Sequence, residues 1–260
     1  MTEAQSQYIQ QYFILFNEAI NTTEDGDYVI DLDAVADAIS AEEKPPFYYA
    51  EQSQQNKFIC RACGYTTDIL GTFGYCSICG TRNDLQELES KTIPKLRERI
   101  KSGDSYESCA KDAVAFFDSF VGQYMKELIR YIPMTPPRKN RFEKMRFHDL
   151  NSVASEWKAV FDIDIYSGLK PEDRDFAVLM FHRRHVYEHN GGEADAKYIA
   201  DSGDLGVRVK QALHETQESA HRIAGIVAKM AANLHNGFHE ILPPIERPIA
   251  YNKGRRGRTG

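Results

Sequence analysis

Apolar residues recur every three or four positions along most of the second half of the chain, which is the spacing of one buried face on an α-helix. In the segment from Val209 to Leu234, intervals of four and three alternate as in a heptad seam. Long amphipathic helices joined by short loops favour a mainly α fold, a four-helix up-and-down bundle. The pattern places these helices at about 104–131, 142–161, 171–190 and 207–240.

The third of these helices has a different pattern. Residues 176–181 are apolar on every face, which predicts the most buried helix of the set. Pro171 and the two acids after it are typical of a first helical turn. The sequence becomes abruptly polar at His182, and Asn190 with the two glycines that follow it predicts the C-terminal cap.

Smaller regions flank the bundle. A helical stripe near residues 3–20 and a second short helix from Leu32 to Ile39 indicate an acidic helical N-terminal segment, residues 1–46. The stripe predicts one buried face on the first of these helices. The remaining regions are the cysteine-containing residues 57–85, the bundle at 100–240 and a basic tail at 241–260 that we expect to be disordered.

Four of the five cysteines form two Cys-x-x-Cys pairs with twelve residues between them. Two residues between thiolates allow one tight turn to point both sulfurs at a single ion, and the glycines Gly64 and Gly80 follow where the turn needs positive φ. Four thiolates complete a tetrahedral Zn²⁺ site, so we expect one structural zinc ion per chain. The alternating residues nearby resemble the short strands of a zinc ribbon, with ligands Cys60, Cys63, Cys76 and Cys79.

The fifth cysteine, Cys109, lies on an apolar helical stripe and is interpreted as a small buried thiol.

Charge is distributed unevenly along the chain. Residues 1–56 contain eleven acidic side chains and one basic side chain, a net charge of −10, so the other 204 residues carry +4. The acidic segment could shield a basic surface or contact a protein partner, but a solvated acidic face is the simpler explanation. Zinc ribbons bind nucleic acid or protein or only brace a fold, so the ribbon is a second candidate surface for a partner. With no long apolar run and no signal peptide pattern, we expect no membrane association and a cytoplasmic location.

Residues 138–148 combine five Lys or Arg side chains with two phenylalanines. Basic residues suit phosphates and aromatic rings stack on bases, so Lys139 and Arg141 are candidate RNA contacts. The alternative is the start of an amphipathic helix with a solvated basic face.

The densest polar chemistry lies between Arg184 and Gly192. Imidazole is a base near neutral pH and guanidinium supplies fixed positive charge, so Arg184, His185 and His189 suit RNA cleavage by the neighbouring 2′-hydroxyl without a metal. Arg183 and Asn190 are expected to contact the substrate.

The spacing within this stretch also leaves other roles open. Arg184 and His189 are about 140° apart on an ideal helix, so we expect them to converge by distortion of the last turn or across a dimer. His185 and His189 are spaced to share a metal ion, but the sequence offers no obvious third ligand. An ordinary Arg184–Glu188 salt bridge is a purely structural alternative.

These residues resemble the HEPN superfamily. Arg184, the polar His185 after it and His189 follow the family's R-x(4–6)-H pattern at the end of the third bundle helix. In one toxin branch a tyrosine stands two residues after the histidine, where this chain has Gly191. The resemblance covers about residues 100–240 and extends to His189, Asn190, Gly191, Gly192, Ala194, Asp195 and Tyr198.

The resemblance implies a metal-independent endoribonuclease, a homodimer through the helical bundle, with Arg184 and His189 as the catalytic pair and His185 at the tuning position. It also implies a defence, stress or toxin role. One alternative is a catalytically silent bundle that binds RNA or protein. Another is a ribbon-based transcription adaptor, which would bind DNA without residues 100–260.

Overall fold

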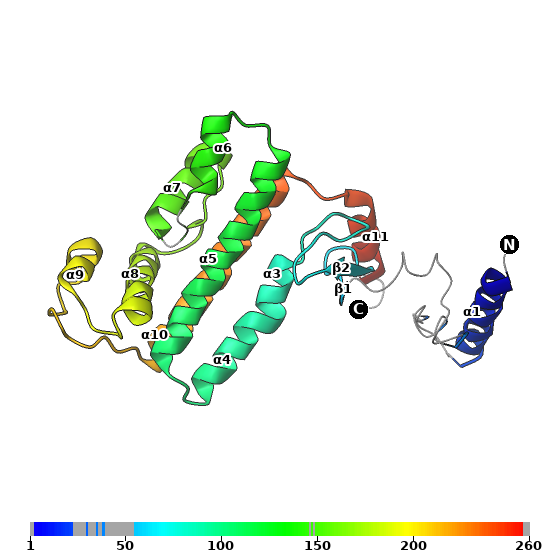
Figure 1. The fold of residues 1–260 in the computed structure, drawn as a ribbon, viewed down its shortest axis with the longest axis horizontal. Helices are drawn as coiled ribbons and strands as arrows, with labels where there is room; N and C mark the ends of the chain where they lie inside the picture. Colours follow the sequence, from blue (N-terminus) through cyan, green and yellow to red (C-terminus); the bar gives the residue numbers. More distant parts are fainter. Residues whose placement is uncertain are drawn as a thin grey trace. The chain divides into compact units, whose positions relative to one another are not determined.

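The computed structural model is mainly helical, as the sequence predicted, and Figure 1 traces the chain. Its described residues fall into two compact units, divided as residues 1–60 with 64–77 and residues 61–63 with 78–260. The structure describes residues 3–22, 30, 35, 38–39, 55–145, 147 and 149–256.

The first unit contains helix α1, Glu3–Thr22, in agreement with the helix predicted at residues 3–20. The prediction of a buried stripe on this helix was wrong. Five of its large apolar side chains are exposed, whereas Tyr8 and Tyr12 are half-buried, and most of the neighbouring chain from residue 23 to 54 lies outside the described residues. The short helix predicted from Leu32 to Ile39 also falls largely outside them. The exposed side chains are Ile9, Phe13, Ile14, Phe16 and Ile20.

The first unit also contains a two-stranded antiparallel sheet. Strand β1, Gln55–Ile59, pairs with strand β2, Thr66–Leu70, in a register that sets Ile59 opposite Thr66. Phe58 and Ile69 are buried, as expected for alternate residues of a sheet with one covered face. The short strands predicted around the cysteines are therefore present.

The second unit is built from helices. Its elements are α3 Asp84–Glu87, the π-helical turn η2 Leu88–Thr92, α4 Ile93–Lys101, α5 Tyr106–Tyr131, α6 Pro136–Glu143, α7 Leu150–Phe161, α8 Pro171–His189, α9 Ala196–Ser202, α10 Gln217–Ile241 and α11 Glu246–Arg256.

Helices α5 and α10 run side by side through the centre of this unit (Figure 1). Helix α8 packs on both of them, α4 packs on both, and α7 packs on α8. The apolar stripes predicted on the two central helices form the core, because burial of these faces is what holds the helices together. Fully buried members of the stripes are Cys109, Ala113, Phe117, Val121, Tyr124 and Leu128 of α5, and Ala220, Ile223, Val227, Met230 and Leu234 of α10.

Two predicted helices have different bounds in the structure. The helix predicted at 142–161 is split, because Asp149 caps a new helix by accepting the backbone N–H of Ser152 at 3.1 Å. The helix predicted from residue 207 begins only at Gln217, where Thr216 accepts the backbone N–H of Ser219 at 3.1 Å. The heptad seam is therefore shorter than its spacing suggested.

Two segments predicted without regular structure contain helices. Helix α9 forms inside the predicted loop 191–206, capped by Asp195 and ended by Gly203 in a left-handed conformation. Helix α11 occupies most of the tail that was predicted to be disordered. It is anchored at its start by the Ile245 N–H, which donates to the Cys79 carbonyl at 2.8 Å.

Helix α8 is less buried than its apolar sequence predicted. Ala177, Met180, Phe181 and Val186 are buried, but the other apolar residues of the helix are only half-buried. Helix α8 packs on α5 and α10, and it is also contacted by α7, by α9 and by the 203–216 segment. Several of its apolar side chains nevertheless remain partly exposed, among them Phe176 and Val178.

Candidate functional site

The candidate site lies at the C-terminal end of α8. The helix ends where predicted, because the Asn190 and Gly192 N–H groups both donate to the Val186 carbonyl, at 2.9 and 3.2 Å. Gly191 and Gly192 have φ values of +59° and +86°, which glycine adopts readily. This cap fixes the position of the polar side chains in the last two turns.

Arg184 lies between two carboxylates. Its Nη1 donates to Asp118 Oδ2 of α5 at 3.0 Å, and its Nη2 lies 3.3 Å from Glu188 Oε2. The i, i+4 salt bridge that the sequence offered as a structural alternative is thus present. The Arg184 Nε is buried and has no hydrogen-bond partner among the described residues.

His185 and His189 lie side by side on the exposed surface of α8, with ring centroids 4.7 Å apart. His189 Nε2 lies 4.0 Å from the same Glu188 oxygen that contacts Arg184. Arg184 and His189 therefore approach the same carboxylate within a single chain. The helix stays regular to His189, so no distortion of its last turn brings them together.

Asn190 and His185 both lie near Asp195, the cap of α9. The Asn190 side-chain amide donates to Asp195 at 2.9 Å. The backbone N–H of Tyr198 lowers the pKa of Asp195, with smaller contributions from Asn190 and from the charge of His185. Asp195 thus ties the predicted residues at the end of α8 to the next helix.

Arg183 faces the other way, into a polar network. Its guanidinium donates to Glu215 at 2.9 Å, to Asp204 at 3.1 Å and to the Tyr198 hydroxyl at 3.3 Å. The Tyr187 hydroxyl donates to the same Glu215 oxygen at 2.7 Å. Burial works against the charge of Arg183, but donation to Glu215 raises its pKa. Its guanidinium is engaged in holding the 203–216 segment on α8, so we leave it out of the proposed site.

Lys139 and Arg141 are not brought to this end of the unit. Both are exposed on α6, which follows the C-terminal end of α5, and they pair with Glu143 and Glu156. The C-terminal end of α8 instead lies near the N-terminal end of α5, where Glu107 accepts the backbone N–H of Glu215 at 3.2 Å.

The four paired cysteines lie together as predicted, with their sulfur atoms within 4.8 Å of one another and all four side chains buried. Gly64 and Gly80 have φ values of +78° and +76°, which confirms the predicted turns. Hydroxyl groups lie next to two sulfurs, Thr67 Oγ1 at 3.4 Å from Cys76 Sγ and Thr81 Oγ1 at 3.2 Å from Cys79 Sγ. This all-thiol cluster could hold a metal ion.

Among the described residues, the four cysteines are the group of three or more His, Cys, Asp or Glu side chains close enough to share a metal ion, and no such group includes His185 or His189. Cys109 is fully buried on α5, and burial raises the pKa of its thiol, as expected for an inert core cysteine.

Sequence reasoning did not select Asp118, the partner of Arg184 from α5. The sequence hint for Asp118 is that it is a single acidic residue directly after Phe117 in a largely apolar stretch.

A second polar cluster was also missed. His235 Nδ1 lies 2.6 Å from the hydroxyl of buried Tyr124, and His239 Nε2 accepts the Arg82 N–H at 3.2 Å. Two histidines four residues apart beside the apolar seam of α10 are the signal that could have found it.

No family model, curated protein or solved structure matches this chain in the three comparisons. Among the helices that the structure describes, none combines the length and apolarity needed to cross a membrane.

Proposed function

We propose that the chain is a metal-independent endoribonuclease of the HEPN type that cuts single-stranded RNA. The observation that carries the proposal is the exposed pair of imidazoles, His185 and His189, with ring centroids 4.7 Å apart next to a guanidinium. Glu188 lies between Arg184 and His189, at 3.3 Å and 4.0 Å from their nitrogens. Two imidazoles and one guanidinium supply the groups that this reaction needs.

The reaction has one proton acceptor, one proton donor and one anion to stabilise. His189 accepts the proton of the 2′-hydroxyl as that oxygen attacks the phosphorus atom. Arg184 donates hydrogen bonds to the phosphorane oxygens. The bond from phosphorus to the 5′-oxygen then breaks, and His185 in its protonated form gives that oxygen a proton. The products are a 2′,3′-cyclic phosphate and a 5′-hydroxyl, and DNA, which lacks the nucleophile, is not cut.

The active form in this proposal is a homodimer through the helical bundle, in which α5, α7, α8 and α10 act as the four bundle helices. A second copy brings its own histidines to the exposed end of α8 and leaves RNA between the two sites. The chain then works in the cytoplasm in defence, stress response or toxicity, and the acidic N-terminal segment or the ribbon binds a protein partner. Asn190 is the proposed substrate contact beside the catalytic groups.

The four cysteines are proposed to hold one structural Zn²⁺ as a zinc ribbon. Four buried thiols leave no open coordination position for substrate, and nearby hydroxyls can donate to the thiolates, as supporting groups around structural zinc do. Bound zinc would supply folding energy to the hairpin and take no part in cleavage.

A second candidate function, a catalytically silent bundle that binds RNA or protein, is favoured by one contact pattern. Arg184 is already paired with Asp118 and Glu188, so a phosphate has to compete with two carboxylates for its guanidinium. If these pairs persist with RNA present, the site binds without cutting.

The deciding experiment is cleavage of a mixed single-stranded RNA by the full chain with its native metal, in buffer without Mg²⁺. Parent, His189→Ala and Arg184→Ala are compared, and Lys158→Ala, on the exposed surface of α7, serves as the control. We expect cyclic phosphate ends from the parent and the control, and losses of at least about 100-fold in both site variants. Equal cleavage by all four proteins, or none at concentrations that give dimers, would overturn the proposal.

A further inference from the structure

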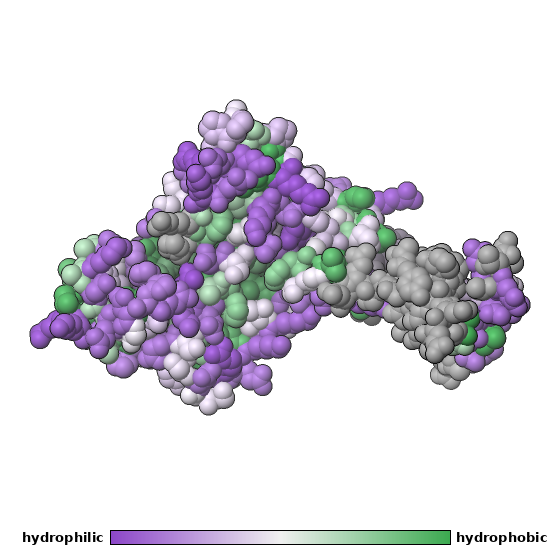
Figure 2. Space-filling model, in the orientation of Figure 1, coloured by the Kyte–Doolittle hydropathy of each residue, from purple (hydrophilic) through white to green (hydrophobic). Residues whose placement is uncertain are grey.

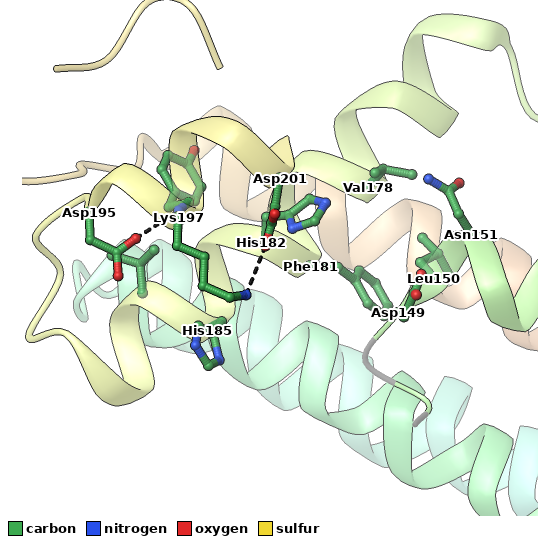
Figure 3. Close-up of a pocket in the computed structure, with 12 residues that line it drawn as sticks. Asp149, Leu150, Asn151, Val178, Phe181, His182, His185, Asp195, Lys197 and Asp201 are labelled. Carbon is green, nitrogen blue, oxygen red and sulfur yellow. Dashed lines mark hydrogen bonds and ion pairs between the residues drawn. The ribbon is translucent and has the colours of Figure 1, made fainter. Parts of the chain in front are cut away.

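A cavity of about 290 Å³ opens between α7, α8 and α9, directly beside the candidate site. Figure 3 shows the α7 residues at one end and the α9 residues at the other, with His182 and His185 of α8 between them. His185 belongs both to this cavity and to the imidazole pair with His189. A ligand in the cavity is therefore next to the proposed reaction centre.

The floor of the cavity is apolar. Leu150 of α7 and Phe181 and Val186 of α8 are buried there, and Val178 adds a half-buried side chain. This floor is apolar because residues 176–181 of α8 are apolar on every face, including the side that lines the cavity. A flat, largely apolar ring gains from burial on such a surface.

The rim of the cavity is polar and carries an excess of negative charge. Asp149, Asp195 and Asp201 contribute three carboxylates, whereas Lys197 contributes the one ammonium group among the lining residues. Lys197 Nζ donates to Asp201 at 2.8 Å, so its charge is already balanced (Figure 3). Excess negative charge disfavours a phosphate in the cavity, and carboxylates accept hydrogen bonds from N–H groups.

We propose that this cavity binds the base of the nucleotide beside the cleaved phosphate and selects bases with an exocyclic amino group, adenine, cytosine or guanine, over uracil. The selection rests on the proposed ribonuclease function, and it names the substrate class of that site. The base lies on the apolar floor against the imidazoles of His182 and His185, which offer stacking surfaces. Its exocyclic amino group, which projects from the ring, donates to Asp149 or Asp201, whereas the N3–H donor of uracil lies between two carbonyl oxygens that a carboxylate repels.

The test measures nucleoside binding directly, with the full zinc-loaded His189→Ala protein. Adenosine, cytidine, guanosine and uridine are titrated and followed by NMR. We expect uridine to bind weakest, by roughly tenfold, which is the scale of discrimination that a well-placed base contact gives. Equal binding of the four nucleosides would overturn the proposal.

Two isosteric variants locate the effect. Asp201→Asn keeps the shape of an exposed side chain, and Asp149→Asn keeps an N-cap because asparagine caps as well as aspartate. If one of these carboxylates accepts the amino group of the base, its change to asparagine should weaken the binding of adenosine, cytidine and guanosine roughly tenfold. Asp162→Asn, at the far end of α7, is the matched control with no expected change. Parent-like binding by both cavity variants would contradict the assignment.

The failure of each proposal has its own signature. If the parent protein does not cut RNA but the nucleoside preference is present, the base site stands and the ribonuclease is wrong. If the protein cuts RNA with uridine as frequent as other nucleotides next to the cut, the ribonuclease stands and the base site is wrong.

Discussion

Ile163 lies directly against the helical backbone at Gly237. A Cβ atom at position 237 would fall 2.8 Å from Ile163 Cγ1 and 2.9 Å from Cγ2, closer than carbon atoms pack. The β-branched side chain of Ile163 is buried and cannot swing away. We therefore expect Gly237→Ala to lower the free energy of unfolding by about 1–3 kcal/mol, the range for overpacking a core. Urea unfolding of the parent and the variant measures this change in free energy.

The matched control lies on the same helix. Gly225 has no atom within 4 Å of an added Cβ, so Gly225→Ala changes helix propensity alone. Alanine in a helix interior is more stable than glycine by about 1 kcal/mol, and we expect a gain of up to that amount. Two substitutions of one kind on α10 should thus have opposite signs, and a gain in both would contradict the close contact at Ile163.

Stability should fall on mild acidification because of a buried histidine. Burial lowers the pKa of His235 to about 3, with smaller contributions from His239 and Arg82. The folded protein therefore keeps His235 neutral, while the unfolded chain takes up a proton below its ordinary pKa near 6.5. Folding stability should be lost progressively from about pH 6.5 toward pH 3, by on the order of a few kcal/mol.

The measurement compares thermal unfolding between pH 7 and pH 4 for the parent, His235→Asn and His214→Gln. Asparagine can accept the hydrogen bond of the Tyr124 hydroxyl but does not titrate, so its pH dependence should be shallower. His214→Gln is the control for loss of a histidine, because His214 is exposed and lies in the loop before α10. Equal slopes in all three proteins would show that His235 does not control the acid transition.

Metal content should depend on the paired cysteines and not on the fifth. We expect one zinc ion per chain in the parent by native mass spectrometry, and loss of the ion with Cys76→Ser. Cys109→Ala should keep the ion, because Cys109 is a buried residue of α5 and is not a member of the four-cysteine group. A chelator should lower the unfolding temperature of the parent, since removal of a ligand of the folded state removes its stabilisation. Metal content that is unaffected by Cys76→Ser would refute this ligand set.

The parts of the fold that sequence reasoning recovered are those set by local pattern. The cysteine cluster was predictable because each pair and its glycine form one turn, as at Cys60, Cys63 and Gly64. The start of α10 was not, because Leu213 keeps the heptad spacing and is buried while it belongs to the loop before the helix. An apolar residue that is buried from a loop looks the same in the sequence as one that is buried from a helix.

The surroundings of the candidate site depend on residues that are distant in sequence. Arg183 was predicted to bind substrate, but its guanidinium is paired with Glu215 and Asp204, which lie 32 and 21 residues away. The amino-acid composition of this stretch does not reveal which side of α8 each arginine faces. The packing of α8 between α5 and the 203–216 segment decides it.

The pairing of Arg184 with Asp118 joins α8 to α5 at one level along their axes. A slip of α8 by one turn, about 5.4 Å, would carry the guanidinium away from that carboxylate while apolar side chains of similar size could still pack. The ion pair thus fixes the position of α8 along the axis of α5. A partner that shifts α8 would change the charge environment of the site with no change in any residue at its surface.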